Sequence, residues 1–134
     1  MPEPTPELSC TWPAVPESVS QARAAVAAFG TAAGATLEAI NAMRLAVSEA
    51  VTNAVLHAYL DAGVPGGVHV RAGHDSGGLW IEVADDGRGM LPRADSPGGG
   101  LGLPLIAQMT AEFAIDRADG GGTKLRMHFG GAAT

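Results

Sequence analysis

The most continuous hydrophobic pattern in the chain lies at residues 43–59, MRLAVSEAVTNAVLHAY. Its apolar residues leave little of a helical surface polar, which predicts a long helix from a cap at Thr36 to about Leu60, packed on both sides. Glu49 and Asn53 interrupt the pattern, and their spacing places them on one helix face about one turn apart. Two such groups need partners when buried. Either they bond each other or water at the helix edge, or they hold an ion, a water and a ligand phosphate.

Shorter patterns predict the remaining elements. Apolar and polar residues alternate in strands, and glycine and proline mark the turns. We expect an edge strand at 8–14, a helix at 16–29 that stops within 30–34, a hairpin of strands 68–72 and 79–83 around a 74–78 turn, a helix at 103–111, and strands at 113–117 and 123–129. The order β-α-α-β-β-α-β-β predicts an α+β fold, a two-layer α/β sandwich. Its helices lie on one face of a mainly antiparallel mixed sheet.

Composition limits the possible partners. We expect residues 1–134 to form one domain with a proper core, preceded by a flexible Pro-rich lead-in at 1–7. A net charge of −6 argues against direct nucleic-acid binding. The single cysteine, Cys10, excludes an internal disulfide and a cysteine-based zinc site. Charged residues and glycines break the Ala-rich region, and no signal peptide pattern begins the chain. These features predict a cytoplasmic protein that does not enter a membrane.

A D-x-G-x-G motif, Asp85-Asp-Gly-Arg-Gly89, ends a predicted strand. A carboxylate fixed there can accept a hydrogen bond from an exocyclic amine such as that of adenine. The two glycines, Gly87 and Gly89, let the backbone approach a flat ring or adopt a positive φ. A plain Asp-Gly turn is the alternative interpretation.

A second glycine-rich motif, Gly98-Gly-Gly100-Leu101-Gly102, runs into the predicted helix at 103–111. Glycine amides beside a helix N-terminus can cradle phosphate, although a flexible linker fits the same composition. No Lys-Ser/Thr follows, so this is not a P-loop, and the spacing does not fit a dinucleotide fingerprint.

Three other features carry weaker signals. Thr123, after Gly122, opens the last predicted strand, where one hydroxyl could bond back to the strand-end carboxylate. Arg23 lies among alanines on the first predicted helix, where a solvated position is the simpler interpretation. The four histidines lack metal-ligand spacing, so we expect no metal role for them.

The order of these motifs carries more information than each alone. SEAVTNAVLHAY, then DDGRG, GGGLGL and GT, resembles the GHKL ATPases, and within them the anti-sigma factor serine kinases of bacterial partner-switching systems. The similarity covers roughly residues 7 to 130. It implies the Bergerat α/β sandwich, with ATP between the helix layer and a lid.

The resemblance also implies site residues and partners. Asn53 would ligate Mg²⁺, Glu49 would be the general base, and Asp85 would read the adenine amine. Gly87 and Gly89 would give clearance and Thr123 would support Asp85, while Gly98, Gly100, Leu101 and Gly102 would surround the phosphates. The reaction would be γ-phosphoryl transfer to a serine of an anti-anti-sigma (STAS) protein. A sigma factor and a second copy in a homodimer are further implied partners, and Arg23 is a candidate contact.

Two other functions stay open. A short segment between Gly89 and Gly98 forms the expected lid. It favours a catalytically weak or inactive module that binds nucleotide or a partner. The catalytic domain of a sensor histidine kinase is disfavoured, because no helix pair with a phospho-accepting histidine precedes the Glu49 helix.

Overall fold

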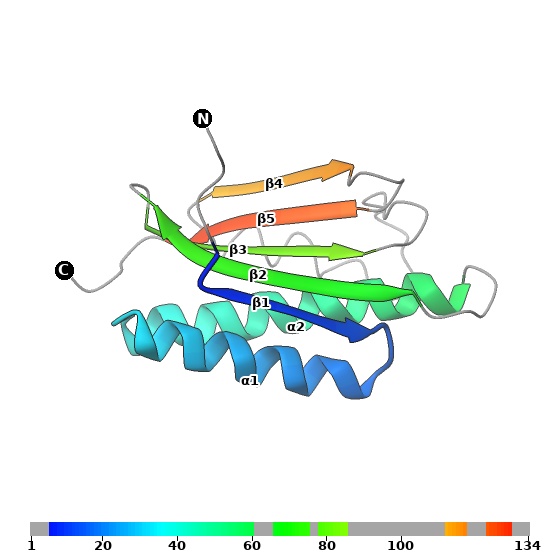
Figure 1. The fold of residues 1–134 in the computed structure, drawn as a ribbon, viewed down its shortest axis with the longest axis horizontal. Coiled ribbons are helices and arrows are strands. Elements are labelled where there is room, and N and C mark those ends of the chain that lie inside the picture. The colour runs from blue at the N-terminus through cyan, green and yellow to red at the C-terminus, as the bar shows by residue number, and fades with distance from the viewer. Residues whose placement is uncertain (1–5, 61–65, 76–77, 86–111, 118–122, 130–134) are drawn as a thin grey trace.

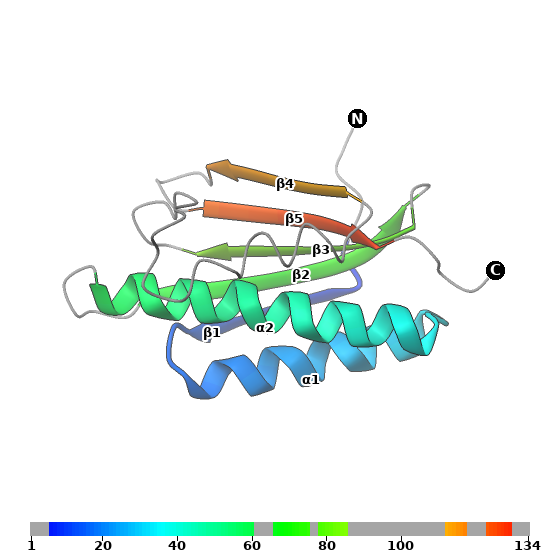
Figure 2. The same ribbon diagram turned by 180° about the vertical axis from the view of Figure 1, so that it is seen from behind.

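Two helices cover one face of a five-stranded sheet in the computed structural model, which describes residues 6–60, 66–75, 78–85, 112–117 and 123–129. Figure 1 shows the helix layer below the sheet, and Figure 2 shows α2 from behind, running along that layer. The elements are β1 (Leu8–Pro13), α1 (Glu17–Ala32), α2 (Leu37–Leu60), β2 (Gly67–Asp75), β3 (Gly78–Asp85), β4 (Glu112–Arg117) and β5 (Thr123–Phe129). The predicted α+β sandwich is confirmed.

The sheet has the order β1-β2-β3-β5-β4, and all four pairings are antiparallel. The described sheet is therefore antiparallel throughout, rather than mixed. β1 forms an edge, as the proline at its last position requires. β5 lies between β3 and β4, so the last strand of the chain is inserted beside the hairpin.

The start of α2 is held by its own side chain. Thr36 Oγ1 accepts a hydrogen bond from the Ala39 amide at 3.1 Å, and the Thr36 carbonyl accepts the Ile40 amide at 2.9 Å. This is the N-cap arrangement that satisfies a donor in the first turn. The predicted cap at Thr36 is confirmed.

The end of α1 lies inside the predicted stop region. The helix continues through Gly30 to Ala32, and Gly34 then adopts a φ of +79°. Gly30 lies within α1 at the point where this helix meets α2. A β-carbon built there would lie only 3.1 Å from Ile40 Cγ1 and 3.2 Å from Met43 Sδ. The absence of a side chain thus lets the two helices approach closely.

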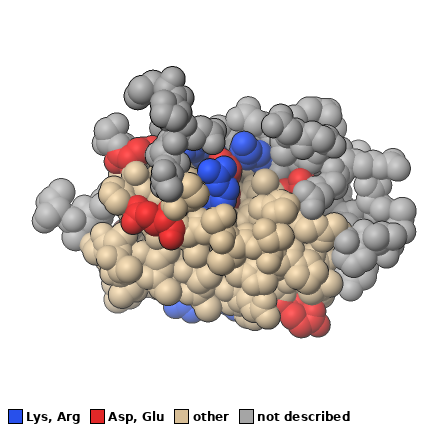
Figure 3. Space-filling model, in the orientation of Figure 1, with Lys and Arg blue, Asp and Glu red and all other residues tan. Residues whose placement is uncertain are grey.

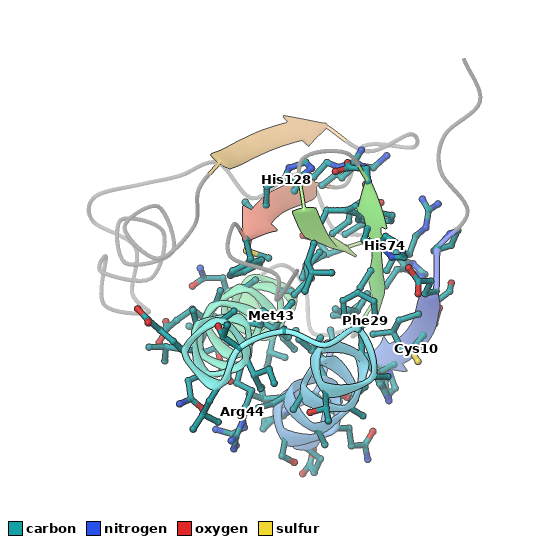
Figure 4. All side chains as sticks on the ribbon, turned by 90° about the vertical axis from the view of Figure 1, so that its left-hand side faces the viewer. Cys10, Phe29, Met43, Arg44, His74 and His128 are labelled. Atoms are coloured by element: carbon teal, nitrogen blue, oxygen red, sulfur yellow. The ribbon has the colours of Figure 1, made fainter. Side chains whose placement is uncertain are left out.

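The core fills the space between the helix layer and the inner face of the sheet. Figure 4 shows Phe29 of α1 and Met43 of α2 pointing into this space. The largest fully buried members on the strands are Ile81, Leu125 and Met127. Among the described residues, no helix combines the length and hydropathy needed to cross a membrane.

The hairpin differs from its prediction. β2 runs to Asp75 and β3 begins at Gly78, and these two residues pair in register. The predicted turn at 74–78 was therefore too long, because His74 pairs with Leu79 in spite of its polar side chain. Glu7 forms an ion pair with His74, which extends the contact between the start of β1 and the end of β2. The predicted helix at 103–111 lies outside the described residues.

The outer face of the sheet carries a polar network. Arg71 donates to Glu82 at 3.3 Å, and His128 lies 3.1 Å from an Asp75 carboxylate oxygen. Figure 3 shows charged side chains of both signs over the sheet, above a broad uncharged area. The core residues of β2, β3 and β5 alternate along each strand with these charged residues and point toward the helices.

Candidate functional site

The two polar residues of α2 lie at the margin of its buried surface. Glu49 and Asn53 are half-buried, whereas Ala46, Ala50 and Ala54 are buried in the helix layer. In the described part of the chain no hydrogen bond joins the Glu49 and Asn53 side chains. Of the first interpretation, that the pair bond each other or water at the helix edge, the direct bond is not observed. A carboxylate and an amide oxygen lie in sequence along one flank of α2.

Leu45 corrects one part of the sequence interpretation. The apolar pattern at 43–59 predicts a helix packed on both sides, but Leu45 within it is 43% exposed. It lies one turn before Glu49 on the same flank. The helix is thus covered on two sides and open on a third, which the nearly all-apolar pattern could not indicate.

Asp85 is the last residue of β3 and is only 8% exposed. Leu79, Ile81 and Val83 of this strand belong to the core, so alternation places Asp85 on the same face of the sheet, toward the helices. β3 is in contact with α2. The strand-end carboxylate therefore lies on the side of the sheet that carries α2.

Thr123 begins β5, which is the direct neighbour of β3. The ladder between β3 and β5 ends at the pair Ala84 and Lys124, so the next position on each strand is Asp85 and Thr123. Figures 1 and 2 both show that β3 ends where β5 begins, at the end of the molecule that holds the C-terminal half of α2. The fold brings the backbone of these two predicted site positions together.

The glycine motifs lie outside the described residues. This applies to Gly87, Gly89, Gly98, Gly100, Leu101 and Gly102. Arg23 is half-buried on α1, so it belongs to a different helix from Glu49 and Asn53. The described site therefore consists of two residues of α2 and the adjacent ends of β3 and β5.

Comparison with known proteins shows the family of this chain. The family model "Histidine kinase-like ATPase domain" matches residues 12–129, nearly the whole described fold. The chain belongs to the histidine kinase-like ATPase family. The resemblance to the GHKL ATPases predicted from the sequence motifs is thereby confirmed, and an ATPase domain implies ATP binding.

Relatives of this ATPase domain are anti-sigma factors. The anti-sigma F factor of Clostridium acetobutylicum is 34% identical over 122 residues, which cover 83% of this chain and 84% of the relative. The anti-sigma F factor of Bacillus licheniformis is 26% identical over 132 residues and 90% of each chain. The predicted similarity to the anti-sigma factor kinases is confirmed at this level.

A solved structure has the same ATPase fold. The crystal structure of the RsbU and RsbW domains of Rv1364c from Mycobacterium tuberculosis superposes with a TM-score of 0.71 and 28% identity. The match covers 94% of this chain and 33% of that longer chain. Nearly all of this chain therefore corresponds to about one third of that chain.

Proposed function

We propose that this protein is a Mg·ATP-dependent serine protein kinase that also acts as an anti-sigma factor in a partner-switching system. The observation that carries the proposal is the placement of Glu49 and Asn53 on one open flank of α2, on the side of the sheet where β3 ends in Asp85. A base, an oxygen ligand and a strand-end carboxylate are the groups that this chemistry needs. The names of the relatives add the anti-sigma role.

The residues present fit a magnesium ion and ATP. The Asn53 side chain offers an amide oxygen at a half-buried position, and magnesium prefers oxygen ligands. Asn53 would hold the ion, and Asp85 would accept a hydrogen bond from the adenine amine. When bound, the metal supplies charge neutralisation to the phosphates. Thr123 would support Asp85 from the neighbouring strand, and Gly87, Gly89, Gly98, Gly100, Leu101 and Gly102 would line the nucleotide.

Glu49 would act as the general base. Its carboxylate would accept the proton of the serine hydroxyl while the serine oxygen forms a bond to the γ-phosphorus and the bond to the β-phosphate oxygen breaks. The products are phosphoserine and ADP. Such a reaction depends mostly on positioning and electrostatic stabilisation. The Glu49 carboxylate is half-buried on α2, and in this role it would lie within hydrogen-bond reach of the serine hydroxyl.

The proposed macromolecular partners are those that the resemblance to the anti-sigma factor kinases implies. The acceptor would be a STAS anti-anti-sigma protein, and the sequestered protein would be a sigma factor. A second copy would complete a homodimer, and Arg23 on α1 would contact a partner. Sedimentation of the purified protein at several concentrations tests the homodimer, because a monomer at all concentrations would contradict it.

The first experiment measures nucleotide binding. Calorimetric titration with Mg·ATP should give micromolar-range binding by the wild type and a large loss in Asn53→Ala. The matched control is Asn41→Ala, an exposed asparagine three turns earlier on α2, which should bind as the wild type does. No binding by the wild type would favour the alternative function, a regulatory module that has lost nucleotide.

The second experiment separates binding from transfer. Glu49→Ala should retain Mg·ATP affinity but lose phosphate transfer to a purified STAS protein. Equal transfer rates for Glu49→Ala and the wild type would show that Glu49 is not the base. Binding by the wild type without transfer to any STAS protein would leave the chain a binding module.

A further inference from the structure

Large exposed apolar side chains are rare in the described part of the protein. Leu37 is 74% exposed and Leu45 is 43% exposed, and both belong to α2. Leu37 is the first residue of the helix, where exposure is ordinary. Leu45 lies in the middle of a packed helix and is followed one turn later by Glu49. Unlike Leu37, it lies in the interior of the helix and next to Glu49.

Helix geometry places Leu45 next to the proposed base. Residues four apart are separated by about 6 Å along the axis and about 40° around it. Leu45 precedes Glu49 by this step, and Asn53 follows Glu49 by the same step. The flank of α2 therefore presents an apolar side chain, a carboxylate and an amide in that order.

The order of Leu45, Glu49 and Asn53 along α2 fits the geometry of phosphoryl transfer. The attacking and leaving oxygens lie roughly in line on opposite sides of the transferred phosphorus. If Asn53 holds the metal on the nucleotide side of Glu49, the acceptor approaches from the other side, where Leu45 lies. Arg44 does not compete for this place, because Figure 4 shows its side chain pointing away from the sheet, on the outer side of the helix layer.

We propose that Leu45 is a specificity-determining residue of the acceptor site, contacting an apolar side chain that lies beside the acceptor serine. This inference rests on the proposed kinase function and names one feature of its substrate. Burying the exposed part of Leu45 against an apolar neighbour removes both surfaces from water, which favours association. The exposed Asn41, one turn further from Glu49, offers a polar group at the rim of the same contact.

The test compares two matched substitutions. Leu45→Gln removes the apolar contact and keeps a helix-forming residue of similar length at a partly exposed position. Leu37→Gln makes the same change about 18 Å from Glu49 along the helix axis, where no contact with the acceptor serine region is expected. Purified STAS-domain proteins of the source organism serve as acceptors, and Mg·ATP affinity is measured for each variant by calorimetry.

We expect Leu45→Gln to raise KM for the STAS acceptor about three- to tenfold, with kcat and Mg·ATP affinity unchanged, since a partial apolar contact is lost. Leu37→Gln should match the wild type. Replacing the apolar residues next to the acceptor serine should remove most of the difference between Leu45→Gln and wild type, because contacting residues are not additive.

The other results either overturn the inference or separate it from the kinase function. Equal KM values for wild type and Leu45→Gln would remove Leu45 from the acceptor site and leave the kinase function standing. Loss of Mg·ATP affinity in Leu45→Gln would place Leu45 in the nucleotide site instead. If the wild type transfers no phosphate but binds a STAS protein, weaker calorimetric binding by Leu45→Gln supports the contact and the kinase function fails. If it neither transfers nor binds, both fail.

Discussion

The guanidinium of Arg126 stacks over the indole of Trp80, 4.7 Å from the ring centroid, on the face of the sheet opposite to the helices. Trp80 is only 1% exposed there, although it lies outside the cluster of core residues. Among the described side chains, Trp80 Nε1 and Arg126 Nε are buried without hydrogen-bond acceptors. The pair is therefore held by the cation–π contact and by burial of the ring.

Gly73 is a second neighbour of Trp80 on this face. The two residues pair across β2 and β3, and a β-carbon built on Gly73 would lie 2.9 Å from Trp80 Cζ2. We expect Gly73→Ala to lower the free energy of unfolding by about 1–3 kcal/mol, since the ring must shift from its packed position. Urea unfolding measures this change.

A double variant gives the control for this steric explanation. In a Trp80→Leu background the added methyl group meets a smaller side chain, so Gly73→Ala should cost clearly less. An equal cost in both backgrounds would attribute the effect to the backbone of β2 rather than to the indole.

The ion pair between Arg71 and Glu82 predicts an asymmetry between two substitutions. The Glu82 side chain is 4% exposed and that of Arg71 is 31% exposed. Arg71→Met removes this partner from a buried carboxylate, which should cost about 1–3 kcal/mol. Glu82→Gln should cost less stability than Arg71→Met. The Arg71 guanidinium reaches water, and the glutamine side chain still offers it an oxygen acceptor. Unfolding in urea compares the two.

The double variant Arg71→Met/Glu82→Gln isolates the buried charge. It should be more stable than Arg71→Met alone, because an uncharged amide replaces the buried carboxylate that has lost its partner. A double variant that is less stable than either single variant would contradict this account.

Local chemistry explains which parts of the fold could be predicted. The bounds of β5, Thr123–Phe129, follow from strict alternation after a run of glycines, and the α2 cap follows from a threonine before a helical pattern. The predicted bounds of the hairpin turn were wrong, because the polar His74 is paired with Leu79 in the ladder. The exposure of Leu45 depends on which sides of α2 are covered, and this is a tertiary property that periodicity does not contain.

The outer face of the sheet shows a second limit of the same kind. The partnership of Arg71 with Glu82 follows from the register of the hairpin, which in turn depends on a connection of only two residues between Asp75 and Gly78. A turn longer by one residue would change the residues that face each other. The candidate site residues remain predictions from motifs, whereas the pairing of Arg71 with Glu82 required the register.

Thr36 gives a direct measure of how much one cap contributes. Thr36→Ala should lower the free energy of unfolding by about 1 kcal/mol, because the Ala39 amide loses its side-chain acceptor. Thr36→Ser keeps the hydroxyl and should remain close to the wild type. Thermal unfolding of the three proteins at one pH makes the comparison. Equal losses in both variants would show that packing of the Thr36 methyl group matters, and not the hydrogen bond.

Asp85 provides the sharpest test of the nucleotide site. Its carboxylate ends β3 on the helix side of the sheet, opposite the position of Thr123. Asp85→Asn keeps the shape of the side chain but replaces a charged acceptor of the adenine amine with an amide. Hydrogen bonds to charged groups are worth about 1.5–3 kcal/mol, which predicts roughly a 10- to 100-fold loss of ATP affinity by calorimetry.

The choice of nucleotide distinguishes the adenine role of Asp85 from a general loss of structure. Inosine triphosphate carries a carbonyl in place of the adenine amine and should bind weakly to the wild type. Asp85→Asn should reduce or remove this preference, because an amide can also donate to a carbonyl. If the variant unfolds at the same temperature as the wild type and keeps the same ratio of the two affinities, Asp85 does not read the base. A lower unfolding temperature with both affinities reduced equally would assign Asp85 a structural role at the end of β3.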